Sequence, residues 1–157
     1  MRPITVIESP YSDGGAESNL ETAIDYAAQA CLHSVNSGEA PIASHLLYTQ
    51  FLNDNDPVER MIGIECGMEF SRPAKNIAFY IDHGISRGMF NALLAFSSDE
   101  RLSSKVVFRS LNGDIGTIHA IGTAYNTLVQ IDCDYEGWVA DAESLFAEFL
   151  KPVTSAD

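Results

Sequence analysis

The segment from residue 77 to residue 96 constrains the fold most, because its hydrophobic pattern changes halfway along. Residues 77–80 form a short apolar run typical of a buried strand, and an apolar helical pattern follows from about Ser86 to Phe96. In an open α/β sheet, the carboxyl end of a strand, the loop after it and the free amides of the next helix face one crevice. The segment therefore predicts a ligand site at the edge of a parallel sheet.

The same alternation of strand and helix patterns recurs along the first two thirds of the chain. We expect strands at residues 4–7, 40–43, 77–80 and 106–108. Helix starts are marked by a capping box at Ser18 and Glu21, and by Asp56 followed by Pro57. Strands and helices that alternate at this spacing predict an α/β fold with a doubly wound parallel sheet.

The pattern changes after about residue 111. Asn112-Gly113 predicts a turn, and residues 115–121 with 127–131 predict a hairpin of alternating strands. Residues 137–139 fit a third short strand, and Asp141 is the expected cap of a final helix. We therefore divide the chain into an α/β domain at residues 1–112 and a small β-rich appendage, a hairpin plus a helix, at residues 113–157.

Composition and charge exclude several classes of protein. Apolar residues make up 46% of the 157, enough for one core, but no stretch reaches the roughly eighteen apolar residues of a membrane span. The start of the chain lacks a signal-peptide pattern, so we expect a cytoplasmic protein with no membrane partner. The formal charge of −13 argues against nucleic acid as a partner, because phosphate binding needs clustered Lys and Arg.

Motifs for metals and cofactors are missing from the sequence. Cys31, Cys66 and Cys133 are odd in number and form neither a disulfide framework nor a zinc motif. The histidines do not fall at metal-ligand spacings, and neither the dinucleotide nor the P-loop glycine fingerprint occurs. We therefore predict no metal and no cofactor.

Three loops that follow predicted strands supply the candidate site. Their candidate ligand-binding residues are Ser9, Pro10, Tyr11, His45, Asp82 and His83. The Tyr11 ring could stack on a base, and Asp82 could accept a hydrogen bond from a sugar hydroxyl or act as a general acid. Structural alternatives remain open: a rigid turn at residues 9–11, helix packing for His45 and a simple turn at residues 82–84.

The start of the helix after Ile85 completes this candidate site. Ser86 and Arg87 bring a hydroxyl and a cation to the positive end of the helix dipole. Gly88 would let a ligand approach the helix closely. The loops and this helix start suit a ligand that carries hydroxyls and up to one phosphate.

Several segments together resemble a known group of proteins. They are Ser9-Pro10-Tyr11, Asn19, the run from Ala40 to Tyr48, the run from Phe51 to Arg60, Gly63, and Ile85-Ser86-Arg87-Gly88-Met89. Over about residues 3–111 they resemble an uncharacterised domain family of bacteria and phages that is similar to the nucleoside 2-deoxyribosyltransferases.

This resemblance implies a flavodoxin-like fold, a nucleoside-type ligand and contacts from Asn19 and Met89. In the transferases a glutamate attacks the anomeric carbon and a nearby acid protonates the departing base. By position, Asp82 matches an aspartate at the end of the third strand, and Ser86 stands where a second aspartate often lies. The glutamate is expected three residues after Met89, where this chain has Ala92, and a methyl group cannot attack.

The leading hypothesis is therefore a protein that binds a nucleoside, a nucleotide or a nucleotide-derived signal without turning it over. A phage counter-defence protein or an accessory of nucleotide metabolism would fit, and in a phage its place would be the host cytoplasm. The alternative is an active N-glycosidase or deoxyribosyltransferase that uses Asp82 as acid and another carboxylate, with Glu8 and Asp13 as candidates. Whether the chain is an enzyme thus stays open.

A third hypothesis makes the acidic segment at residues 113–157 the working part, with the α/β domain as its scaffold. In each case we expect a homo-oligomer.

Overall fold

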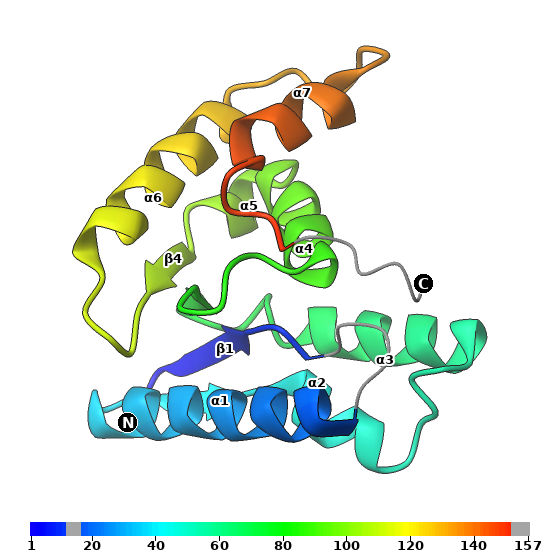
Figure 1. Ribbon diagram of the computed structural model, residues 1–157, viewed down its shortest axis with the longest axis vertical. Coiled ribbons are helices and arrows are strands. Elements are labelled where there is room, and N and C mark those ends of the chain that lie inside the picture. Colours follow the sequence, from blue (N-terminus) through cyan, green and yellow to red (C-terminus); the bar gives the residue numbers. More distant parts are fainter. Residues whose placement is uncertain (12–16, 152–157) are drawn as a thin grey trace.

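A four-stranded parallel sheet lies at the centre of the protein, in the order β2-β1-β3-β4 (Figure 1). The computed structural model describes residues 1–11 and 17–151. Its strands are β1 (Ile4–Glu8), β2 (Ala40–Ile42), β3 (Asn76–Tyr80) and β4 (Val106–Arg109). The helices are α1 (Glu17–Asn36), α2 (Ser44–Leu47), η1 (Tyr48–Gln50), α3 (Pro57–Glu69), α4 (Arg87–Ser97), α5 (Glu100–Ser103), α6 (Ile115–Val129) and α7 (Trp138–Phe146). The predicted α/β class with a flavodoxin-like, doubly wound parallel sheet is confirmed.

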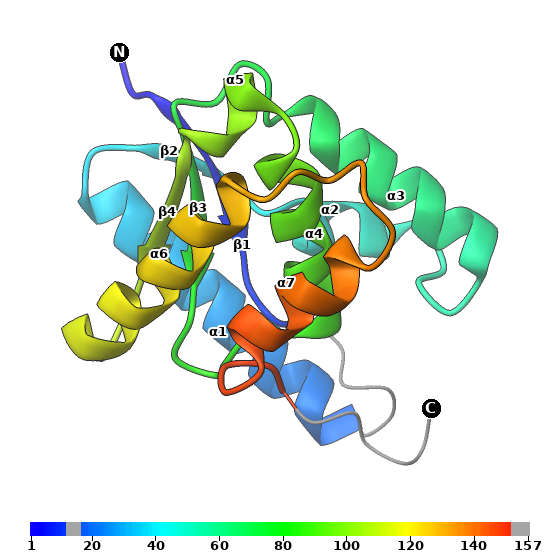
Figure 2. The ribbon, with the colours of Figure 1, turned by 90° about the horizontal axis from the view of Figure 1, so that it is seen from above.

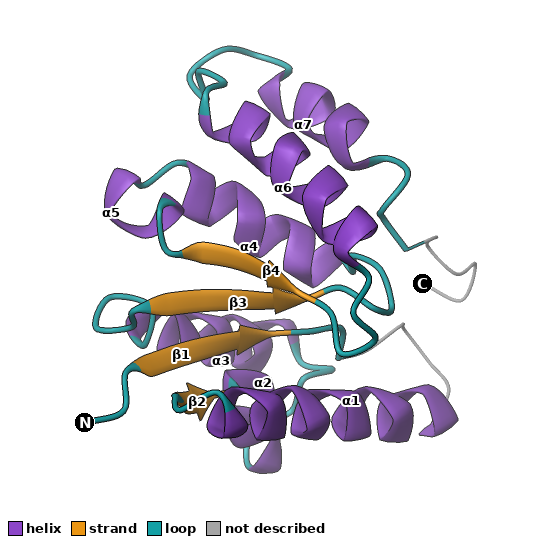
Figure 3. Ribbon diagram, turned by 90° about the vertical axis from the view of Figure 1, so that its left-hand side faces the viewer, coloured by secondary structure: helices purple, strands orange, loops and turns teal. Residues whose placement is uncertain are grey.

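Alternate residues of β1 serve two separate cores, because successive side chains of a strand point to opposite faces. Ile7 packs with Tyr26 and Ala30 of α1. Val6 belongs to a larger cluster that includes Leu93 of α4. Helix α1 runs along the lower side of the sheet in Figure 3, with α6 and α7 above it. Seen from above, α4 lies between α3 and α6 (Figure 2).

Local signals place the two helices that border the carboxyl edge of the sheet. Asp56 caps α3 and accepts hydrogen bonds from the amides of Val58 at 2.8 Å and Glu59 at 3.2 Å. Ser86 caps α4 and accepts from the amide of Met89 at 3.2 Å. Both caps satisfy amides that the helix itself cannot pair, so both helix starts follow from the sequence. Among the described residues, no helix is long and apolar enough to cross a membrane.

The predicted hairpin at residues 115–131 is wrong, because Ile115–Val129 is helix α6. Ile121, Tyr125 and Leu128 recur at helical spacing and are buried. Asp114 caps the helix through the Thr117 amide at 3.1 Å. The β-branched residues of this segment favour strands when read alone. The segment is a helix because a helical face of apolar residues is buried in the core.

The predicted strand at residues 137–139 and the cap at Asp141 are also wrong. Gly137, at a left-handed φ of 94°, precedes α7, which already begins at Trp138, and Asp141 lies in its first turn. Ala142 and Phe146 on one face of α7 are fully buried, and Phe146 packs against Phe90 of α4, so the helix removes this apolar face from water.

The C-terminal helices are part of the main core and support a loop of the candidate site. Ile121 and Phe146 belong to the same buried cluster as Val6 and Ile77. After α7, the carbonyl of Phe149 accepts from the amide of Ile85 at 2.8 Å, and the amide of Lys151 donates to Ile85 at 2.9 Å. The segment after α7 is thus tied by backbone bonds to the loop between β3 and α4.

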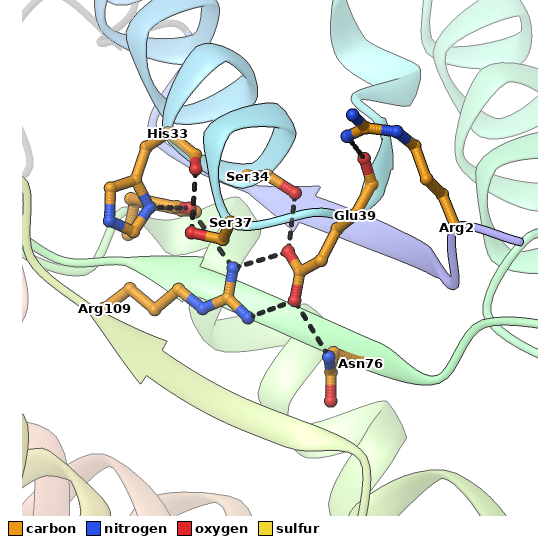
Figure 4. A network of polar contacts seen from close by, with 8 residues as sticks. Arg2, His33, Ser34, Ser37, Glu39, Asn76 and Arg109 are labelled. Atoms are coloured by element: carbon orange, nitrogen blue, oxygen red, sulfur yellow. Dashed lines mark hydrogen bonds and ion pairs between the residues drawn. The ribbon is translucent and has the colours of Figure 1, made fainter.

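An ion pair between Glu39, which precedes β2, and Arg109 of β4 links the two edges of the sheet across its α1 face (Figure 4). Arg109 donates to both carboxylate oxygens at 2.7 and 2.8 Å, and Ser34 of α1 donates to one of them at 2.6 Å. Asn76 adds a fourth bond at 3.1 Å. The hydrogen bonds from Arg109 lower the pKa of Glu39 to about 2, so the carboxylate stays charged at neutral pH.

Candidate functional site

The strand order reverses between β1 and β3. The chain passes from β1 to β2 on one side, and then returns to the other side of β1 to form β3. In open α/β sheets, ligands bind outside the carboxyl ends of the strands at such a switch point. Here that edge carries residues 8–11, His45, Arg60 and residues 86–88, which we call the switch-point site. Helices α2 and α3 lie at the end of β1 (Figure 1).

Ser9, Tyr11 and His45 come together at this edge, as the sequence predicted. Ser9 Oγ and His45 Nε2 share a hydrogen bond at 2.9 Å, and the Tyr11 ring meets His45 edge-on with centroids 5.7 Å apart. Burial lowers the pKa of His45 to about 4, so the imidazole is neutral at neutral pH. A neutral imidazole can donate from one nitrogen and accept at the other. Pro10 is buried beside this group.

A cavity of about 80 Å³ opens beside His45, and Tyr48 and Arg60 also line it. It lies between α2 and α3. These helices pack closely at Gly67, because glycine has no Cβ; a Cβ there would lie only 2.6 Å from Ser44 Oγ. Pockets that enclose a drug-sized ligand measure about 300–1,000 Å³. The cavity therefore has room for one part of a nucleoside.

The start of α4 is open on the side that faces Arg60. A Cβ at Gly88 would lie 4.0 Å from Arg60 Nη2 and 4.0 Å from Ser86 Oγ. Arg60 also donates to Asp54 at 2.8 Å. Arg60 belongs to a segment that carries the family resemblance but was not predicted as a ligand residue, since nothing in its local pattern shows that α3 brings it to α4.

Two predicted ligand residues at the start of α4 have other partners. Arg87 pairs with Glu143 of α7 at 2.6 Å, and its guanidinium lies 5.6 Å from the Phe90 ring centroid. Met89 is only 2% exposed and belongs to the main core. The sequence could not distinguish these structural roles from ligand contacts, because both place the residues in the same turn of α4.

Asp82 is held by the structure rather than left open for a ligand. Its carboxylate accepts hydrogen bonds from Tyr26 and Ser110 at 2.5 Å and from the amides of Leu111 at 2.9 Å and Asn112 at 3.1 Å. Burial alone raises the pKa of Asp82, but these hydrogen bonds outweigh burial and lower it to about 2. The group is therefore a charged anchor for the loop after β4.

His83 and Ser86, two further predicted ligand residues, also have structural contacts. His83 stacks on Tyr26, with centroids 4.2 Å apart and an interplanar angle of 26°, beside Asp82. Ser86 serves as the cap of α4. The side chain of Asn19 and all of Asp13 lie outside the described residues.

Glu8 is the carboxyl group of this edge that has no partner among residues 1–11 and 17–151. It is the last residue of β1, opposite Phe79 in the sheet register, and is half-buried. Burial raises its pKa to about 7. Its sequence signal is a charged residue at the end of a short, mainly β-branched and buried strand.

Ala92 is half-buried against the main core on α4. Glu65 and Glu69 are exposed on α3. Within the described ranges, no three His, Cys, Asp or Glu side chains gather in a way that could hold a metal ion.

Comparison with known proteins identifies the family but no activity. Residues 3–103 match a family described as a domain of unknown function, DUF7768. No curated protein and no solved structure matches the chain. The matched region runs from β1 to α5 and contains every strand of the switch-point site. The chain therefore belongs to the DUF7768 family of domains of unknown function.

Proposed function

We propose that the protein binds a nucleoside, a nucleotide or a nucleotide-derived signal at the switch-point site without turning it over. The observation that carries the proposal is the group of Ser9, Tyr11 and His45 beside a cavity at the reversal of the strand order. The Tyr11 ring offers a face for a base, and a neutral His45 offers hydrogen bonds. The resemblance to deoxyribosyltransferases supports a nucleoside-type ligand.

Ala92 supports binding without turnover. It occupies the place where the resemblance expects an attacking glutamate, and a methyl group can neither attack an anomeric carbon nor donate a proton. Loss of a nucleophile normally lowers the rate by powers of ten while ground-state binding survives. Asp82, the acid that the alternative requires, is already saturated with hydrogen bonds.

Native mass spectrometry after incubation with nucleosides, nucleotides and cyclic nucleotides would test the proposal. We expect at least one to be retained with micromolar affinity, and calorimetry would then give its Kd. Retention of none of them would refute nucleoside-type binding. Size-exclusion chromatography with light scattering would test the expected homo-oligomer on the same samples.

Glu8 favours one second candidate function, an N-glycosidase in which this carboxyl replaces Asp82 as acid. A carboxyl group whose pKa is raised to about 7 holds a proton near neutral pH and can transfer it to a departing base while a water molecule adds to the anomeric carbon, which gives free base and free sugar. Chromatographic detection of free base from deoxynucleosides would support it, and Glu8→Gln should abolish that release. No release at high protein concentration would leave the binding proposal as the better account.

A further inference from the structure

Glu8 faces the same side of the sheet as α4. Val6, two residues earlier on β1, packs in the cluster that contains Met89 and Leu93, whereas Ile7 packs in the α1 cluster. Because side chains of a strand alternate, the Glu8 side chain lies on the Val6 side. Helix α4 begins at this edge and covers this face, so Glu8 and the start of α4 border the same space.

The cations nearest this space are already paired. Arg60 binds Asp54 at 2.8 Å, and Arg87 binds Glu143 at 2.6 Å. Lys151, whose side chain lies against Gly84, is likewise engaged. Residues 9–11, 43–56 and 81–86, the loops of the site, contain no Lys or Arg. A phosphate here would find no unpaired cation among the described residues and would approach the Glu8 carboxyl.

A carboxyl group in that position favours one class of ligand. Its oxygens accept hydrogen bonds from sugar hydroxyls or from the N–H edge of a base. A phosphate offers only acceptors when fully ionised. Above about pH 7, where Glu8 is mostly ionised, a phosphate and the Glu8 carboxylate are like charges that repel each other at a partly desolvated site. The raised pKa of Glu8 agrees with this picture, since a neighbouring cation would have lowered it.

We propose, building on the nucleoside-type function above, that Glu8 contacts the ligand and selects an uncharged nucleoside over its phosphorylated forms. Glu8 accepts a hydrogen bond from the nucleoside, either from a sugar hydroxyl or from a base N–H. Ser9, Tyr11 and His45 hold the rest of the ligand. The selectivity follows from the charge arrangement of this chain: one unpartnered carboxyl and no unpaired cation beside it among the described residues.

Calorimetry with matched ligands tests this assignment. Four ribonucleosides, their 2′-deoxy forms and their 5′-monophosphates would be titrated into the full chain and into Glu8→Gln at about pH 8, above the Glu8 pKa of about 7, where the carboxyl is mostly ionised. We expect the best nucleoside to bind about tenfold or more tightly than its monophosphate, because a hydrogen bond to a charged group is worth roughly that factor or more. Glu8→Gln should lower the affinity for the nucleoside by a similar factor. The ratio between the nucleoside and monophosphate affinities should therefore become smaller. A loss in Glu8→Gln that is confined to ribonucleosides would assign the donor to the 2′-hydroxyl, and an equal loss for both sugars would assign it to the base or the remaining hydroxyls.

Glu65→Gln on the exposed face of α3 is the matched control and should leave both affinities unchanged. A thermal melt would check that Glu8→Gln is folded. A monophosphate that binds as tightly as its nucleoside, or an unchanged nucleoside affinity in folded Glu8→Gln, would overturn the assignment of Glu8 while the binding function stood. Binding of neither class would refute the proposed function itself.

Discussion

The hydroxyl of Tyr26 makes two hydrogen bonds to Asp82: it donates to the carboxylate at 2.5 Å and accepts from the backbone amide at 2.9 Å. The two residues are 56 positions apart, on α1 and on the loop after β3. These two bonds hold the loop after β3 against α1. They explain why the aspartate that sequence reasoning assigned to a ligand instead holds the fold.

Asp82→Asn should therefore lower stability with or without ligand. An amide cannot accept all four hydrogen bonds as a carboxylate does, and losing bonds to a charged group at this partly exposed site should cost on the order of 1–2 kcal/mol. The native carboxylate stabilises the fold above about pH 4 and loses this effect as pH falls through about 2. Urea denaturation of both proteins would measure the difference. An unchanged midpoint would contradict the anchoring role.

Breaking the Glu39–Arg109 pair by removing one partner should lower the free energy of unfolding strongly. Removing one partner, as in Arg109→Met, leaves the largely buried Glu39 carboxylate uncompensated and should cost about 3–5 kcal/mol. The exposed pair of Arg72 and Glu69 is the control, and Arg72→Gln should cost less than about 1 kcal/mol. Denaturant unfolding compares the two. Equal losses would show that burial does not strengthen the Glu39–Arg109 pair.

Glu8 and His45 should make opposite contributions to the dependence of stability on pH. The pKa of Glu8 rises from 4.5 to about 7 on folding, so its contribution to stability falls as pH rises between these values. The pKa of His45 falls from 6.5 to about 4, so its contribution falls as pH drops through that range. Between about pH 4.5 and 6.5 the two effects oppose each other, and the wild-type melting temperature should change little on their account.

Single substitutions should expose each slope. Glu8→Gln should lose stability on acidification from about pH 6.5 to 4.5, because only the His45 effect remains. His45→Gln should instead lose stability as pH rises over the same interval. Scanning calorimetry across these pH values gives the slopes. Parallel curves for the two variants would contradict the assigned burial effects.

Tyr11→Ala should weaken ligand binding with little effect on folding. Tyr11 is half-buried and its described ring contact is the one with His45, so few core contacts are lost. Loss of stacking on a base costs about 1–3 kcal/mol, or roughly tenfold and more in Kd. Tyr135→Ala, which removes a more exposed ring beside α7, is the control. Equal affinities for the two variants would remove Tyr11 from the site.

A chain truncated after residue 112 should not fold cooperatively. The truncation removes Ile121, Tyr125, Leu128 and Phe146 from the main core. At about 1.5–3 kcal/mol for each large buried side chain, the loss matches the whole stability of a typical domain, about 5–15 kcal/mol. Circular dichroism during thermal unfolding would test this. A sharp transition in the truncated chain would establish residues 1–112 as an independent domain and residues 113–157 as an appendage.

The sequence alone determined the elements whose signals are local. The strands at residues 4–7 and 77–80 are short apolar runs, and Asp56 and Ser86 mark helix starts through bonds to amides two or three residues away. Their alternation was enough to predict the parallel sheet and the edge where Ser9, Tyr11 and His45 meet. Periodicity and capping are properties of neighbouring residues, so one sequence contains them.

Only the tertiary structure decided the roles that depend on distant partners. Residues 115–129 are β-branched enough to suggest strands, and their packing on the sheet makes them a helix. Asp82 became an anchor because Tyr26 and Ser110 reach it from 56 and 28 positions away. Glu8 has no partner in the described chain, whereas Arg60 and Arg87 pair with Asp54 and Glu143. Which charges and apolar faces meet is set by long-range packing, and no local pattern records it.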